Sequence, residues 1–190
     1  FIPKASNYQY ETVPQPGLNG RTGYQPRGRG LGGSSAINAM VYIRGHSQDY
    51  DGWASRAGLE NWTYADCLPY FRKAETRAKG GDLYRGDSGP LHVSTGACRN
   101  PLYNAFIEAG KQAGYSYTED MNGYQQEGLG PMDMTVHKGR RWSTAMAYLR
   151  PALTHKKLKL QTRSLVTHVM FEGPAGAPHA VGVEVSHGRQ

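Results

Sequence analysis

A glycine-rich segment, residues 28–38, carries the clearest chemical signal in the sequence. It reads Gly-Arg-Gly-Leu-Gly-Gly-Ser-Ser-Ala-Ile-Asn and is followed by the apolar residues Ala39, Met40 and Val41. Because glycine has no Cβ and tolerates positive φ, such a segment lets the backbone come close to a ligand. Where it leads into a helix, free N–H groups can bind an anion or a polar cofactor. A flexible linker would be followed by polar residues, so the segment predicts a ligand site built mainly from backbone groups.

The glycine spacing alone does not identify the ligand. Gly28, Gly30 and Gly33 fit G-x-G-x-x-G, which in a dinucleotide site follows a strand and precedes an acidic residue. Asp49 lies at a suitable distance, but residues 17–27 contain no apolar run. A Rossmann first turn is therefore disfavoured, and a P-loop is excluded because no Gly-Lys-Ser/Thr follows.

Several blocks together resemble the glucose–methanol–choline (GMC) flavoprotein oxidoreductases. The first block is the glycine segment, continued through residues 42–45 to Asp49. Tyr10–Gln15 resembles the family segment that precedes it, and three later blocks agree in order and spacing: Asp66–Glu75, Gly86–Leu91 and Arg140–Ala152. The resemblance covers nearly the whole chain, so it is far more specific than one glycine motif. Within the family it is strongest to the animal mitochondrial members that oxidise choline.

The resemblance implies that this chain contributes to an FAD site. It assigns the approach to the flavin ring to Gly30, Ser34, Asn38, Ala39, Met40 and Val41, and the adenine contact to Val166. Some choline-oxidising relatives bond a histidine covalently to the flavin at the position of Ile37, so FAD is expected to be held non-covalently here. From the residues alone, the favoured role of Asn38 is to cap the helix or to satisfy a buried carbonyl, and Leu165–Val169 is an ordinary strand by pattern.

The resemblance also implies an activity, which belongs to a longer parent protein. The expected reaction is oxidation of choline to betaine aldehyde by hydride transfer to flavin N5, with a quinone or another acceptor taking the electrons. The expected location is mitochondrial, with peripheral association at the matrix side of the inner membrane. No catalytic residue is expected in this chain, because the family's N-terminal strand–turn–helix and its catalytic histidine match nothing here. The chain is thus interpreted as an internal fragment that is inactive alone.

Two other functions stay open at this point. One is a GMC enzyme that oxidises another alcohol or uses oxygen as its acceptor. The other is a non-catalytic module that binds a nucleotide or a phosphate through the glycine segment. Aromatic residues such as Tyr8, Tyr10, Tyr42 and Trp62 could line a cage for the choline cation, although packing roles are the favoured interpretation.

Composition narrows these possibilities. The 190 residues carry a formal net charge of +7, which favours anionic partners, but no nucleic-acid-binding motif is present and we interpret the charge as a solvated basic face. The sequence contains no run of eighteen apolar residues, so it predicts no membrane-spanning helix. Cys67 and Cys98 lack C-x-x-C spacing, which indicates two reduced thiols in an intracellular protein. No histidine pattern predicts a metal site.

The patterning predicts a mixed α/β (α+β) fold without repeats. Helices are expected over residues 34–43, from Thr63 onward with Asp66 completing a capping box, from Asn100 to Gly114, and from Ser143 to a stop at Pro151. The buried stripe of the third helix is expected to comprise Leu102, Phe106, Ile107, Ala109 and Ala113.

Strands are expected at residues 91–94, 132–136, 158–160, 165–171 and 181–185, and a hairpin-type turn at Asn19–Gly20. In terms of function, residues 1–46 would form the flavin-facing segment. Residues 47–160 would supply helices and strands of the FAD and substrate region, and residues 161–190 would return as strands to the FAD-binding domain.

Overall fold

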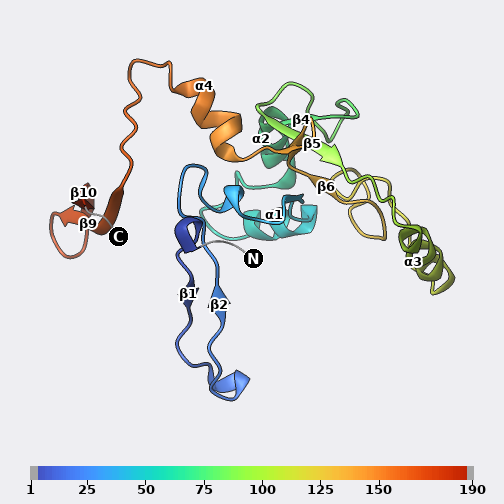
Figure 1. Cartoon of the computed structure of the whole chain (residues 1–190), viewed down its shortest axis with the longest axis horizontal. Coiled ribbons are helices and arrows are strands. Elements are labelled where there is room, and N and C mark those ends of the chain that lie inside the picture. Colours follow the sequence, from blue (N-terminus) through green and yellow to red (C-terminus); the bar gives the residue numbers. More distant parts are fainter. Residues whose placement is uncertain (1–3, 188–190) are drawn as a thin grey trace. The chain divides into compact units, whose positions relative to one another are not determined.

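The computed structural model describes residues 4–187 and divides into two units at Pro151 (Figure 1). Helices and strands occur together in the first unit, and the second is a β-hairpin with its leading segment. This composition confirms the predicted mixed α+β class. The proposed functional boundaries at residues 46 and 160 stay a prediction.

The first unit begins with a short 3-10 turn, Lys4–Ser6, and a long hairpin. Strand β1 (Tyr10–Glu11) pairs antiparallel with β2 (Tyr24–Gln25), and a 3-10 turn, Pro16–Leu18, forms the tip. Asn19 and Gly20 have φ of 54° and 74°. The predicted turn is therefore confirmed, since both residues tolerate this left-handed conformation.

The helix predicted over residues 34–43 is wrong. The glycine segment leads into a single 3-10 turn, Gly33–Ala36, and then into strand β3 (Val41–Tyr42). Ile37 leaves helical geometry at φ −126°, and Met40 has φ 65°. A non-glycine residue with positive φ interrupts a right-handed helix, so the apolar run becomes a strand.

Two helices follow β3. Helix α1 (Ser47–Ala54) is capped by His46, and α2 (Tyr64–Ala74) is capped by Thr63 with Asp66 in the predicted capping box. Pro69 lies inside α2 without ending it. The rings of Trp53, Tyr64 and Phe71 surround Tyr50 at centroid distances of 5.3–6.0 Å, which joins the two helices.

A four-stranded sheet in the order β3-β6-β5-β4 forms the centre of the first unit. Strands β4 (Glu75–Arg77) and β5 (Leu91–Thr95) are parallel, whereas β6 (Asp133–Met134) is antiparallel to both β5 and β3. The strand predicted over 132–136 is split, because Thr135 leaves the sheet and β7 (Val136–His137) pairs with β8 (Arg140–Arg141) instead. The predicted strand at 91–94 is confirmed.

Helix α3 (Pro101–Gln112) begins after Asn100, whose side chain accepts a hydrogen bond from the Leu102 N–H, as predicted. The predicted buried stripe is wrong. Ile107 is buried, but Leu102 and Phe106 are 72% and 63% exposed, and Ala109 and Ala113 are also exposed. The helix packs through the neighbouring face that carries Ile107 and Gly110, where Gly110 leaves room for Leu129.

The chain then forms a π-helix, Ala145–Leu149, which continues into α4 (Arg150–Ala152). The predicted stop at Pro151 is wrong, because the helical segment continues through Pro151 to Ala152. The strand predicted at 158–160 is also wrong, since these exposed residues are irregular. Strands β9 (Ser164–Glu172) and β10 (His179–His187) form the second unit's antiparallel hairpin and confirm the last two predicted strands.

Candidate functional site

The glycine segment folds back on itself. The Gly28 N–H donates to Ser34 Oγ at 3.1 Å, and the Gly33 N–H donates to the Gly30 carbonyl at 3.0 Å. A Cβ on Gly28 would lie 2.1 Å from the Gly33 carbonyl oxygen. Gly30 has φ 140°, which L side chains rarely adopt. The loop therefore requires glycine at both positions.

This loop is bound to a distant segment, residues 141–145. Ser35 Oγ donates to the Gly32 carbonyl and accepts the Thr144 N–H at 3.0 Å, while the Thr144 hydroxyl lies 3.3 Å from the same carbonyl. A Cβ on Gly32 would be only 3.2 Å from the Cβ of Ala145. Two blocks that sequence reasoning treated separately thus form one structure, and no pattern in the sequence paired them.

Asn38 lies at the end of the loop, and the oxygen of its side-chain amide is held by two hydrogen bonds. Its Oδ1 accepts hydrogen bonds from the Met40 N–H at 3.0 Å and from Arg141 Nη1 at 2.8 Å. The same Arg141 nitrogen donates to the Ser35 carbonyl at 3.2 Å. Met40, in its left-handed conformation, is fixed by the Thr135 N–H, which donates to the Met40 carbonyl at 2.8 Å.

The loop's chemistry fits the predicted role. Among the predicted flavin-facing residues, Met40 is half-buried and the rest are exposed: Gly30, Ser34, Asn38, Ala39 and Val41. Within residues 4–187, neither the side-chain Nδ2 of Asn38 nor the Ala39 backbone N–H has a hydrogen-bond acceptor, whereas the Asn38 backbone N–H donates to the Ser34 carbonyl at 2.9 Å. Exposed donors at fixed positions suit the carbonyl and ring-nitrogen acceptors of a flavin's pyrimidine edge.

Val166, the residue predicted to contact the adenine, belongs to the second unit and not to this loop. It is half exposed on β9, in the second unit. The predicted adenine contact of Val166 stays a prediction.

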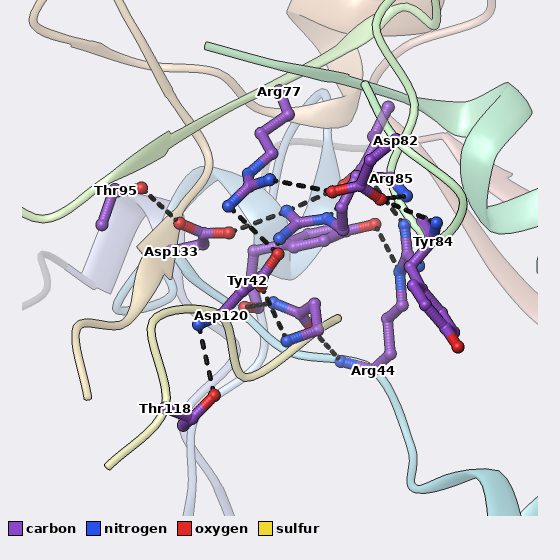
Figure 2. A network of polar contacts seen from close by, with 12 residues as sticks. Tyr42, Arg44, Arg77, Asp82, Tyr84, Arg85, Thr95, Thr118, Asp120 and Asp133 are labelled. Carbon is purple, nitrogen blue, oxygen red and sulfur yellow. Dashed lines mark hydrogen bonds and ion pairs between the residues drawn. The ribbon is translucent and has the colours of Figure 1, made fainter. Parts of the chain in front are cut away.

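Next to Tyr42 of β3 lies a buried cluster of charged side chains that the sequence did not predict (Figure 2). Glu75 is fully buried at the start of β4. Its Oε1 accepts from Arg44 at 2.7 Å, from Arg85 at 2.9 Å and from the Gly86 N–H at 2.9 Å, and its Oε2 accepts from Arg85 at 3.2 Å. Charged residues usually lie on the surface, and nothing in their spacing indicated this cluster.

Arg85 connects the remaining acids of the cluster. It donates to Asp133 at 2.7 Å and to Asp120 at 2.5 Å, and Arg77 pairs with Asp120 at 3.0 Å. Burial acts to lower the pKa of Arg85, but hydrogen bonds to Glu75 and Asp133 outweigh it and raise that pKa. Burial likewise acts to raise the pKa of Asp120, but the Asn122 N–H and the arginines outweigh it and lower that pKa. Both shifts favour the charged forms of Arg85 and Asp120, which are paired with each other.

The cluster also holds β3, which contains Val41, the last of the predicted flavin-facing residues. The Arg44 N–H donates to Asn122 Oδ1 at 2.8 Å, and Asn122 Nδ2 donates to the Tyr42 carbonyl at 3.1 Å. The Arg44 side chain reaches the Tyr84 carbonyl at 2.6 Å. Burial raises the pKa of Tyr42, which lies beside the guanidinium groups of Arg44 and Arg85. The fixed position of β3 therefore depends on buried ion pairs.

The histidines show no catalytic arrangement among the described residues. His46 caps α1 through Nδ1. His92 and His137 stack at 3.8 Å beside Trp142. Burial, with His137 and Lys138 nearby, lowers the pKa of His92.

The aromatic residues proposed for a cation cage lie in three separate settings. Tyr8 stacks on Tyr10, Trp62 packs against Trp53, and Tyr42 lies in the charged cluster. Their contacts correspond to the favoured packing interpretation.

Cys67 and Cys98 are free thiols. Over residues 4–187, no helix has the length and apolar character needed to cross a membrane, and no group of three potential ligands could hold a metal ion.

Comparison with known proteins identifies the family. Residues 9–190 match the GMC oxidoreductase family. The chain belongs to this family. Both the resemblance seen in the sequence and the GMC type of fold are confirmed.

Among its relatives, the chain is 58% identical over 178 residues to the mitochondrial choline dehydrogenase of Mus musculus, covering 94% of the chain and 29% of that protein. It is 56% identical over 183 residues to an oxygen-dependent choline dehydrogenase of Paraburkholderia phytofirmans, covering 95% and 32%. A solved structure, pyridoxine 4-oxidase from Mesorbium loti, matches 96% of the chain and 35% of that protein, with a TM-score of 0.85 and 35% identity. The chain thus spans about a third of these proteins' length.

Proposed function

We propose that this chain forms the flavin-facing part of an FAD-dependent oxidoreductase that oxidises choline or a similar small alcohol. The observation that carries the proposal is the loop of residues 28–41. It is bonded to residues 141–145, and the exposed Asn38 and Ala39 each carry an N–H donor with no acceptor among residues 4–187. Identity of 58% to a choline dehydrogenase supports the choice of substrate class.

Each flavin-facing residue has a physical role in this proposal. The glycines let the backbone approach the cofactor without a Cβ, with Gly30 in a conformation that favours glycine. Asn38 and Ala39 offer donors, while Met40 and Val41 extend the contact from β3, and Val166 contacts the adenine. Bound FAD supplies the hydride acceptor. The protein binds and orients the FAD, and its hydrogen-bond donors adjust the electrostatic environment of the flavin ring.

FAD is held non-covalently in this proposal, because Ile37 has no atom that could bond to the flavin. The test is to purify the full-length protein that carries this chain and denature it with acid. Release of all the flavin into the supernatant supports the proposal. Flavin that stays with the precipitated protein would contradict non-covalent binding, and a colourless protein would contradict the cofactor.

The electron acceptor is proposed to be a quinone, with a mitochondrial protein peripherally bound at the matrix side of the inner membrane. The mitochondrial relative supports this location. The oxygen-dependent bacterial relative favours oxygen as the competing acceptor. Steady-state rates with a soluble quinone and with oxygen would distinguish the two.

A second candidate is a GMC enzyme for another alcohol. The structural match to pyridoxine 4-oxidase favours this alternative, since that protein shares 35% identity over nearly the whole chain. Comparing choline with pyridoxine as reductants of the bound flavin tests it directly.

A further inference from the structure

Arg141 and Asn38 lie 103 residues apart in sequence and meet at the flavin-facing loop. One guanidinium nitrogen of Arg141 donates both to Asn38 Oδ1 at 2.8 Å and to the Ser35 carbonyl at 3.2 Å. The Met40 N–H donates to the same Oδ1 at 3.0 Å. Two N–H donors therefore converge on one oxygen, whose two lone pairs can accept both.

This pair of donors fixes which way the Asn38 carboxamide faces. An amide nitrogen cannot accept from two N–H groups, so the atom inside the loop must be the oxygen. The NH₂ group then points away from both donors, and within residues 4–187 it has no acceptor. Asn38 is exposed, so this donor is free to meet a ligand.

The segment around Arg141 also fixes Met40, the residue that supplies the second N–H donor to Asn38 Oδ1. Arg141 pairs with Val136 across β7 and β8, and the Trp142 N–H donates to the Thr135 carbonyl at 2.8 Å. Thr135 in turn donates its N–H to the Met40 carbonyl at 2.8 Å. Both donors to Asn38 Oδ1 are therefore fixed by one stretch of chain, residues 135–142.

We propose that Arg141 is a positioning residue: it locks the Asn38 carboxamide so that its NH₂ group donates to an acceptor on the flavin's pyrimidine edge. This inference rests on the proposed function. A donor at this edge stabilises the negative charge that the ring gains on reduction, and it is most effective when its orientation is fixed beforehand. Arg141 acts through Asn38 and need not touch the ring.

Arg140 offers a matched control. It precedes Arg141 on β8, and successive side chains of a strand point to opposite faces. Arg140 is exposed, and its side chain forms no bond with the described residues. Arg140→Met therefore changes the net charge as Arg141→Met does, but leaves Asn38 held.

The experiment uses the full-length protein with three variants: Asn38→Asp, Arg141→Met and Arg140→Met. Asn38→Asp is the sharpest, because a carboxylate oxygen still accepts from Arg141 and Met40 while the outward N–H is lost. The readouts are the Kd for FAD, the midpoint potential of the bound flavin and the thermal midpoint of the FAD-free protein.

For both Asn38→Asp and Arg141→Met we expect the Kd for FAD to rise about tenfold, the effect of losing one hydrogen bond, and the flavin potential to fall. Arg140→Met should match the wild type in Kd and potential. The thermal midpoint of FAD-free Asn38→Asp should also match the wild type, because its internal contacts survive.

The outcomes separate the two proposals. A wild-type protein that binds no FAD overturns the proposed function. A wild type that binds FAD, with Asn38→Asp unchanged in Kd and potential, overturns the positioning role alone. The same holds if Arg141→Met lowers only the thermal midpoint, which is the mark of a purely structural residue. If Arg141→Met does not fold, Asn38→Asp decides.

Discussion

The buried cluster makes a quantitative prediction at Glu75. Glu75→Gln keeps the size of the side chain but removes its charge, and it places an NH₂ group among the donors of Arg44, Arg85 and Gly86. Glu75 is 0% exposed and accepts four hydrogen bonds. Removing one partner from a buried ion pair costs about 3–5 kcal/mol, so we expect the first unit to lose stability of this order.

Hydrogen exchange of the full-length protein measures this loss locally. Exchange from amides of β4 and β5 should accelerate by about a hundredfold to several thousandfold, at about 1.4 kcal/mol for each factor of ten. Glu108→Gln is the matched control, because Glu108 pairs with Lys111 at 2.7 Å on the exposed surface of α3. It should change stability by less than about 0.5 kcal/mol. Acceleration of β4 and β5 in Glu75→Gln by less than about fivefold would refute this account of the cluster.

Two further predictions concern the loop and the pH dependence of the cluster. Gly28→Ala would place a Cβ 2.1 Å from the Gly33 carbonyl oxygen, so this variant should not bind FAD. In the control variant Gly17→Ala the new Cβ meets nothing within 4 Å, so FAD binding should be retained. Equal FAD content in the two purified variants would contradict the loop geometry. The pKa of Asp120 is lower in the folded protein than its usual value, so its stabilising contribution is complete above about pH 4 and is lost as the pH falls through the folded pKa. Asp120→Asn should therefore flatten the fall in thermal midpoint below pH 4, and an unchanged acid profile would show that Asp120 does not contribute to it.

Local features were predictable because the residues that decide them are adjacent in sequence. Thr63 and Asp66 satisfy each other's backbone N–H groups, Asn100 caps α3 before Pro101, and Asn19–Gly20 tolerates the turn of the first hairpin. Each depends on interactions over three or four residues.

Features that depend on distant contacts were not predictable. The apolar run after the glycines suited a helix, but Thr135 binds the Met40 carbonyl and β6 pairs with β3, which extends the chain. The stripe of α3 that contains Leu102 was a reasonable buried face, yet Leu129 packs against the neighbouring face that carries Gly110.

The charged cluster illustrates the same limit more strongly. Arg44, Glu75 and Arg85 look like surface residues in sequence. They are buried together because the connection between the parallel strands β4 and β5 returns along β4, where Asp87 bridges to Thr76, and brings Arg85 to Glu75. In the loop of residues 28–41, the motif singled out the residues, and their approach to the flavin stays a prediction. The partnership of Asn38 with Arg141 required the structure.

The most direct test of the central claim is anaerobic reduction of the flavin in the full-length protein. We predict that choline bleaches the flavin absorption band, whereas glucose and benzyl alcohol leave it unchanged. A bound flavin that stays oxidised with choline would contradict the proposed substrate, and the absence of any flavin band would contradict the cofactor site itself.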